Sequence, residues 1–250
     1  MRALRISLIT AVVLGGLFVA ADRIAVNYAE SEVADKVRTS QGLSKTPDVS
    51  INGFPFLTQV AGKSLDEVEV SLKGVEATAD GRPVKITEVK AELADVKFDS
   101  NFSSAVAGTA DGSGRVTYED LTRAAPQGAT IAYAGPERAA QGQVKVVGPL
   151  MDLLKGSDRS SGGSGLGDLL NQEVTVYSKV QLVDGKTVRL TAESLPGGIP
   201  IPGLHGLLRD VLDYDLTLEG LPTPLKLDQV SATEQGLHFK GQGRDVSLIG

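Results

Sequence analysis

Residues 67–98 read EVEVSLKGVEATADGRPVKITEVKAELADVKF and alternate apolar and polar side chains over most of their length. The first part places three apolar residues on one face: Val68, Val70 and Leu72. Alternation of this kind is typical of a strand with one buried and one solvated face. The alternation slips near Glu88 and at Ala94-Asp95, where β-bulges would bend the strand. The stretch therefore predicts a hairpin of long, curved antiparallel strands.

A second stretch of the chain is similar to the first. Residues 224–232 match residues 83–91 in residue type at most positions, and each follows a strand with a similar cap, at 216–221 and 70–75. The shared Pro, Lys, Val and Ala at identical offsets favour a repeated unit over chance. We therefore expect an α+β fold in which a helix-plus-hairpin unit is used twice.

Helices and turns are expected around these strands. The apolar spacing predicts amphipathic helices at 22–38 and 204–213, one before each strand pair. Asp184-Gly185 lies between two alternating runs and predicts a tight hairpin. The Gly/Ser-rich segment 157–167 is a flexible loop by composition. It could divide two domains, but similar strand patterns on both sides favour an insertion loop within a single domain at 22–250.

The N-terminus carries a targeting pattern. Arg2 and Arg5 precede the uncharged run 6–21, which ends in the small residues Val19-Ala20-Ala21. This layout predicts that residues 1–21 are a signal peptide or a membrane signal anchor. Sixteen helical residues span roughly 24 Å, short of the ~30 Å hydrocarbon layer, which favours the signal peptide. An apolar stripe continues beyond the run, however, so one helix could extend out of the bilayer. Either way, we expect an extracytoplasmic protein.

Composition excludes several classes of function. The chain has 250 residues, a net charge of −6, no Cys and two His. An acidic chain lacks the positive field that nucleic-acid binding requires, and without Cys there are no disulfides or thiolate metal sites. The sequence contains no nucleophile elbow or phosphate loop. We expect no enzyme activity, no cofactor and no metal, with a hydrolase that uses His205 or His238 as the minor alternative.

Two Gly/Pro-rich connections carry apolar side chains. One is Gly53-Phe54-Pro55-Phe56-Leu57, and the other is the segment 197–203, which contains Ile199 and Ile201 and leads into the expected helix. Apolar residues in such connections either close the end of a core or line an opening. Apolar residues of this kind are usually buried.

A combination of features extends over nearly the whole chain. It begins with the apolar segment ending in Ala21-Asp22-Arg23, the expected helix 24–38 and the stretch from Ile51 to Thr58 (INGFPFLT). It continues with Gly62, the strand with Val68, Val70 and Leu72, then Gly74, and Asp245-Val246. In this combination the chain resembles the LmeA-like family of actinobacterial cell-envelope proteins. Loop 157–167 departs from the pattern. The resemblance implies a tubular, BPI-like fold in which long curved strands wrap a helix and leave an apolar channel. It also implies binding of phospholipids, notably phosphoinositides, a supporting role in lipoglycan biogenesis, and no established catalysis.

The leading hypothesis is that the helices close incompletely on the sheet and leave a groove for acyl chains, with the headgroup at its mouth. The partners would be phospholipid, the cell membrane and an envelope glycosyltransferase, and not nucleic acid. An alternative is a membrane-proximal scaffold that stabilises an envelope enzyme without carrying lipid. The residues expected to contact lipid or membrane are Phe54, Phe56, Leu57, Ile199, Ile201, Leu204, Leu207 and Leu208. Those expected near the headgroup are Lys63, Arg82, Lys85 and Arg244.

Overall fold

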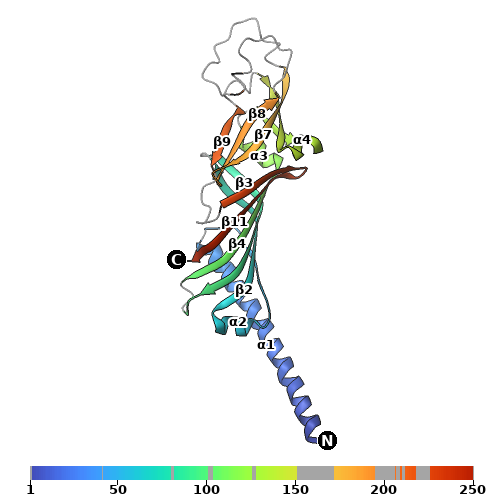
Figure 1. The fold of residues 1–250 in the computed structure, drawn as a ribbon, viewed down its shortest axis with the longest axis vertical. Helices are drawn as coiled ribbons and strands as arrows, with labels where there is room; N and C mark the ends of the chain where they lie inside the picture. The colour runs from blue at the N-terminus through green and yellow to red at the C-terminus, as the bar shows by residue number, and fades with distance from the viewer. Residues whose placement is uncertain are drawn as a thin grey trace.

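A computed structural model shows an elongated α+β protein with a long N-terminal helix and two antiparallel sheets (Figure 1). The structure describes residues 2–40, 42–79, 82–100, 104–125, 128–150, 172–194, 206, 209, 212–217 and 226–249. The predicted fold class, an antiparallel sheet that curves around a helix, is confirmed.

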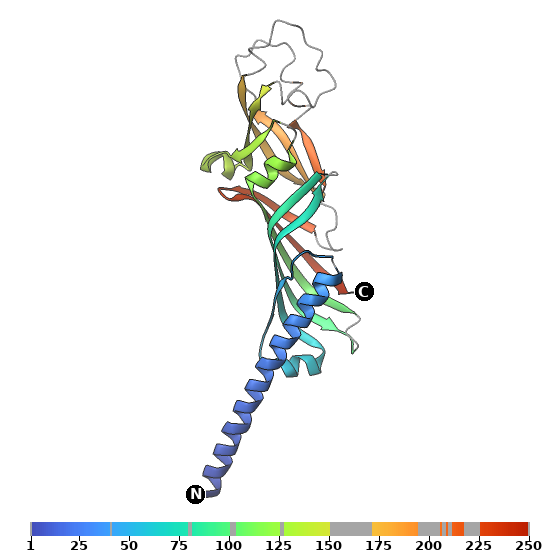
Figure 2. The same ribbon diagram turned by 180° about the vertical axis from the view of Figure 1, so that it is seen from behind.

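Helix α1, Arg2–Ser40, is continuous and has two environments. Residues 3–21 are all exposed and project away from the sheets (Figures 1 and 2). By length and composition, this helix could cross a membrane. From Asp22 onward one side of α1 packs on the protein, where Val26 and Ala34 are buried. The amphipathic helix predicted at 22–38 is thus the second half of a longer helix.

The larger sheet has six strands in the order β1-β2-β3-β4-β11-β10. They are β1 Asp48–Asn52, β2 Ser64–Ala79, β3 Arg82–Phe98, β4 Ala105–Val116, β11 Gly236–Ile249 and β10 Lys226–Thr233. The hairpin predicted from residues 67–98 is the pair β2–β3, in which Val68 lies opposite Leu93. The short helix α2, Phe56–Gly62, lies between β1 and β2 beside α1 (Figure 1).

A line of irregular residues crosses the six-stranded sheet. Asp95 on β3 (φ +52°) and Asp245 on β11 (φ +51°) flank Gly108 on the intervening strand β4. A β-carbon on Gly108 would lie 3.1 Å from that of Asp95, so the strand has little room for a larger residue there. The slip predicted at Ala94-Asp95 is confirmed. Near Glu88, the irregular residue is Gly74 on the neighbouring strand (φ +69°).

The slip turns residues three apart in sequence toward the same core. On β3 both Leu93 and Val96 are buried, and on β4 both Ala107 and Ala110 are buried. Strict alternation would put the members of each pair on opposite faces. The line of irregular residues therefore keeps one face of the sheet apolar along its whole length while the strands bend.

The smaller sheet has five strands in the order β5-β6-β7-β8-β9. They are β5 Thr130–Tyr133, β6 Gln143–Pro149, β7 Glu173–Val183, β8 Thr187–Ser194 and β9 Tyr214–Thr217, with helices α3 Tyr118–Ala124 and α4 Pro136–Ala140 nearby. The predicted hairpin joins β7 to β8, and Asp184 and Gly185 both have positive φ, as such turns require. The turn also meets the larger sheet, because the Leu227 amide donates to the Gly185 carbonyl at 2.7 Å.

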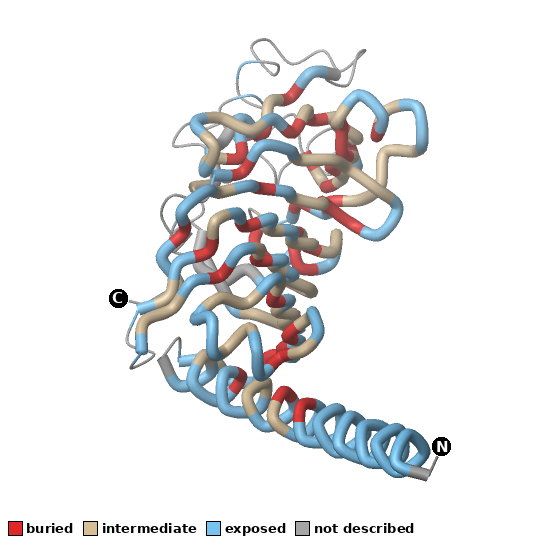
Figure 3. Tube along the Cα trace, turned by 60° about the horizontal axis from the view of Figure 1, so that its bottom comes forward, coloured by how far each residue is buried: buried red, intermediate tan, exposed pale blue. Residues whose placement is uncertain are grey.

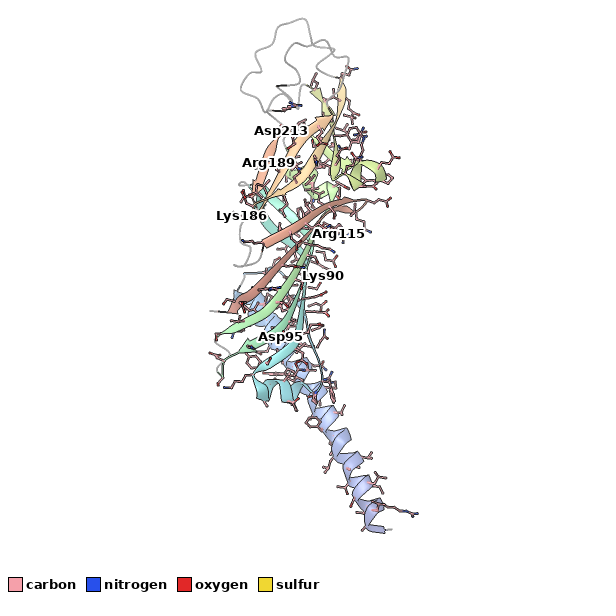
Figure 4. The ribbon with its side chains drawn as sticks, in the orientation of Figure 1. Lys90, Asp95, Arg115, Lys186, Arg189 and Asp213 are labelled. Atoms are coloured by element: carbon pink, nitrogen blue, oxygen red, sulfur yellow. The ribbon has the colours of Figure 1, made fainter. Side chains whose placement is uncertain are left out.

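The second copy of the predicted hairpin unit is divided between the two sheets. Residues 216–221 were expected to pair with 224–232, but β9 pairs with β8 and β10 pairs with β11. An exposed ion pair also joins β8 to β9, in which the Arg189 guanidinium donates two 2.7 Å bonds to Asp215 (Figure 4 labels Arg189). The second hairpin of the larger sheet is therefore β10–β11. Of the predicted helix 204–213, residues 206, 209 and 212 are helical, and most of the rest lies outside the described residues.

Buried side chains gather at two ends of the larger sheet (Figure 3). The lower core lies between this sheet, α1 and α2, and includes Val26, Phe56 and Leu93. The upper core lies between the other end of the sheet, α3 and the smaller sheet, and includes Val116, Leu121 and Leu237.

Asp95→Val should destabilise the bent sheet, because a β-branched residue fits a left-handed backbone poorly. We expect the free energy of unfolding to fall by roughly 1–2 kcal/mol. The control is Glu92→Val, an exposed position on the same strand without positive φ, for which the change should stay within about 0.5 kcal/mol. Urea unfolding followed by circular dichroism measures both. Equal losses for the two variants would contradict the role given to Asp95.

Candidate functional site

The face of the larger sheet on which α1 packs carries two apolar rows between the lower and upper cores. We call these rows the apolar strip. In the order β2-β3-β4-β11-β10, one row is Val70, Ala91, Gly112, Gly241 and Leu227, and the next is Leu72, Val89, Gly114, Phe239 and Val230.

Part of the apolar strip is only half-buried, although it continues the face of both cores; at its β11 and β10 end, Gly241 and Leu227 are buried. Val70, Leu72 and Val89 have intermediate exposure. In the adjacent rows, by contrast, Ala110 is 2% exposed on the α1 side and Leu237 is 2% exposed on the other. Within the described residues, α1 and α2 cover one end of the face and α3 covers the other. Between them, the described residues leave Val70, Leu72 and Val89 of the strip only partly buried.

The middle strands of the strip carry small residues. Ala91, Gly112, Gly114 and Gly241 occupy neighbouring positions on three strands. A β-carbon on Gly114 would find its nearest neighbours 3.9 Å away, so the space above it can accept atoms. Larger side chains, such as Leu72 and Phe239, lie on either side. This low surface between larger side chains suits a slender apolar ligand that lies across the strands.

The opposite face of the same strands is polar. A hollow of about 510 Å³ lies there and is lined by residues that include Lys90, Asp111 and Lys240; Figure 4 labels Lys90 on this face. Glu88 on the same face accepts from Arg115 at 3.4 Å and lies 3.5 Å from Lys90. The sheet therefore has one charged and one apolar face, and only the apolar face suits acyl chains.

The apolar residues predicted around Pro55 have different environments. Phe54 is 57% exposed and Leu57 is 36% exposed, whereas Phe56 is 6% exposed and belongs to the lower core. In this structure Phe56 is a packing residue and does not reach the surface. The other predicted contacts, Ile199, Ile201, Leu204, Leu207 and Leu208, lie outside the described residues.

The basic residues predicted near a headgroup do not form one cluster. Lys63 ends α2 and donates to Ser100 at 2.7 Å. It is followed by Ser64, which pairs with Lys97 on β3. Lys85 lies twelve residues before Lys97 on the same strand, about 40 Å away at strand spacing. Arg82 begins β3, and its side chain lies outside the described residues; Arg244 is exposed beside the line of irregular residues.

One cluster near the apolar strip was missed by the sequence analysis. A β-carbon on Gly74 would lie 3.4 Å from Cε of Lys85 and 3.5 Å from Nζ of Lys45. Both lysine side chains therefore lie close to Gly74, two residues beyond Leu72 of the strip. Neither forms an ion pair in the part of the chain that the structure describes. Lys45 lies in a loop without a recognisable motif, so only the fold brings it to Lys85.

A buried carboxylate joins α1 to α2. The side chain of Asp22 is fully buried, and its Oδ1 accepts from the Leu57 amide at 2.8 Å. Its Oδ2 accepts from Arg23 at 2.7 Å, and the Arg23 guanidinium lies 5.3 Å from the Phe54 ring centre. Pro55, the N-cap residue of α2, makes no capping bond of its own. Asp22 therefore caps α2 from another helix, which satisfies a free amide and complements the helix dipole.

The two histidines considered for a hydrolase were His205 and His238. His238 lies on the polar face opposite Arg115 and Ser231. Burial, together with the charges of Arg115 and Lys240, lowers the pKa of His238, although Glu88 opposes the shift. No hydrogen bond joins His238 to Ser231 among the described residues, and no group of metal-binding side chains is found there. His205 lies outside them.

Asp22→Ala should loosen α2, because the amide of Leu57 loses its acceptor. We expect a lower melting temperature and faster hydrogen exchange of the α2 amides, with a smaller effect for Asp22→Asn, which keeps one acceptor oxygen. Glu32→Gln, an exposed change on the same helix, is the control. Hydrogen exchange by mass spectrometry measures this. Unchanged exchange at residues 56–60 in the Ala variant would contradict the capping role.

Comparison with known proteins agrees with this geometry. A family model described as LmeA-like phospholipid-binding matches residues 20–242, which include the apolar strip, Asp22 and α2. No curated protein and no solved structure matches the chain. The match covers most of the sequence, and the chain therefore belongs to the LmeA-like phospholipid-binding family.

Proposed function

We propose that the protein binds a phospholipid outside the cytoplasm by laying its acyl chains on the apolar strip. The observation that supports this most directly is an apolar face that is buried at both ends of the larger sheet, whereas Val70, Leu72 and Val89 between those ends are only half-buried. Membership of a phospholipid-binding family supports an acyl chain as the occupant. The proposed site is an open strip on the larger sheet, whereas the groove expected from the sequence lay between the helices and the sheet.

The hydrophobic effect can supply the affinity. Each methylene group removed from water contributes about 0.8 kcal/mol, so ten methylenes on the strip would contribute about 8 kcal/mol before the costs of association. Such burial would also cover the half-exposed side chains Leu72 and Val89. The space above Gly114 lets the chain approach the backbone, which increases the area in contact.

Lys45 and Lys85 are suited to hold the headgroup. Their side chains both lie close to Gly74, beside the Leu72 end of the strip, where a phosphate could accept from both ammonium groups. Lysine binds phosphate as a point charge, and two lysines favour a headgroup with more than one negative charge. This supports an anionic phospholipid, including a phosphoinositide, as the ligand.

The wider role follows from the N-terminal segment and the family resemblance. An exposed apolar helix preceded by arginines supports a location in the cell envelope, either anchored or secreted. A lipid held there would support lipoglycan biogenesis, with an envelope glycosyltransferase as a partner. In this role the protein presents or carries lipid and does not itself catalyse a reaction.

Leu72→Glu and Gly114→Leu should each reduce lipid binding, the first by placing a charge on the strip and the second by filling it. We expect at least about a tenfold loss of affinity, equivalent to about 1.4 kcal/mol. Lys73→Glu, the exposed neighbouring position, should bind as the natural protein does. Native mass spectrometry measures bound phospholipid, and circular dichroism verifies folding. Full lipid occupancy in both strip variants would contradict the proposal.

Lys45→Glu combined with Lys85→Glu should remove the preference for anionic lipid without abolishing acyl binding. Each lysine near a charged lipid contributes about 1 kcal/mol, so we expect the preference to fall by roughly tenfold or more. The matched control replaces Lys90 and Lys240 on the polar face with Glu. Competition between phosphatidylinositol phosphate and phosphatidylcholine vesicles measures the preference for anionic lipid. An unchanged preference would exclude this pair as the headgroup site.

A further inference from the structure

Apolar side chains remain exposed where α1 leaves the sheet. The uncharged run of 16 residues at 6–21 is about 24 Å long as a helix, about 6 Å less than the hydrocarbon layer. A bilayer that contains this run would therefore reach the first residues of the folded part, unless it became thinner. The side chains of these first folded residues therefore determine how the protein contacts the bilayer surface.

On its outer side, α1 stays apolar beyond the run. Ile24 is 71% exposed and Tyr28 is 72% exposed, whereas Val26 on the opposite side is buried. Residues four apart share a helix face, so Ile24 and Tyr28 extend the apolar surface by another turn. Tyrosine at this position is typical of membrane interfaces, where the ring lies in lipid and the hydroxyl meets water.

On the sheet side, α2 and the residues just before it supply two more exposed apolar residues at the same level. The bond from Leu57 to Asp22 fixes α2 against the first residue after the apolar run. Phe54 is 57% exposed and Leu57 is 36% exposed. Arg23 lies over the Phe54 ring and is itself 47% exposed on its side chain. This places a cation beside the apolar residues, as at a surface of anionic lipid.

We infer that Ile24, Tyr28, Phe54 and Leu57 form a collar that is embedded in the bilayer interface around the end of the membrane helix. The collar supplies the apolar length that residues 6–21 lack. It gives the protein a second attachment besides the helix, which fixes the orientation of the larger sheet relative to the membrane. The inference does not depend on lipid binding at the apolar strip, because the two sites share no residue.

The absence of cysteine in the natural sequence allows a direct test on the full chain. Single cysteines at Tyr28, Phe54 and Leu57 are labelled with an environment-sensitive fluorophore in nanodiscs of phosphatidylcholine and phosphatidylglycerol. The controls are Lys73→Cys and Glu234→Cys, exposed positions elsewhere on the larger sheet and in its β10–β11 turn. We expect blue-shifted emission and quenching by nitroxide-labelled lipid at the three collar positions, and neither effect at the controls.

The outcomes separate the collar from its alternatives. Quenching at the collar no stronger than at Glu234→Cys would overturn the inference. Protection from aqueous iodide without quenching by labelled lipid would also overturn it, because a protein partner or a second copy would then cover these residues. Because Phe54, Leu57 and Tyr28 are exposed, their replacement should not prevent folding; the melting temperature of each labelled protein verifies this. Loss of lipid from the apolar strip would leave the expected collar signals unchanged.

Discussion

The carboxylate of Asp22 holds the lower half of the molecule together. It is buried where the exposed and packed halves of α1 meet, and it caps a helix that has no side-chain cap of its own. A second bond, from the Ile51 amide to Glu30 at 2.8 Å, joins α1 to the edge strand β1. Through these two bonds, the direction in which the N-terminal helix leaves the protein is coupled to the position of the sheet. The lower core and the proposed collar both depend on that coupling.

The second constraint is the bend of the six-stranded sheet. The sheet has a core at each end, and Leu72 and Val89 of the strip between them are only half-buried. The aligned irregularities at Asp95, Gly108 and Asp245 allow the strands to bend without exchanging their apolar and polar faces. The strip therefore remains apolar between two regions that are packed for stability. This separation lets a binding surface stay half-exposed in a folded protein.

The strand pairs and turns were predicted from the sequence only in part. The β2–β3 hairpin, the β7–β8 turn at Asp184-Gly185 and the slip at Ala94-Asp95 were predicted, because alternation and turn chemistry are local properties. The pairing of residues 216–221 with 224–232 was wrong, since either strand could pair equally well with any strand of suitable pattern. Phe56 and Phe54 belong to one motif, yet one is buried and the other exposed. Local pattern does not distinguish them.

The sequence by itself determined the N-terminal apolar helix, the acidic and cysteine-free composition, the amphipathic strands and the family. Each of these features depends on residue type and on short-range spacing. Only the tertiary structure decided that Asp22 caps α2, that Lys45 and Lys85 both lie near Gly74, and that Gly114 lies between Val89 and Phe239. These contacts join residues that are distant in the chain, and their geometry depends on how strands pair and where the sheet bends. No local preference of the backbone specifies that choice, because it is made by the packing of the whole molecule.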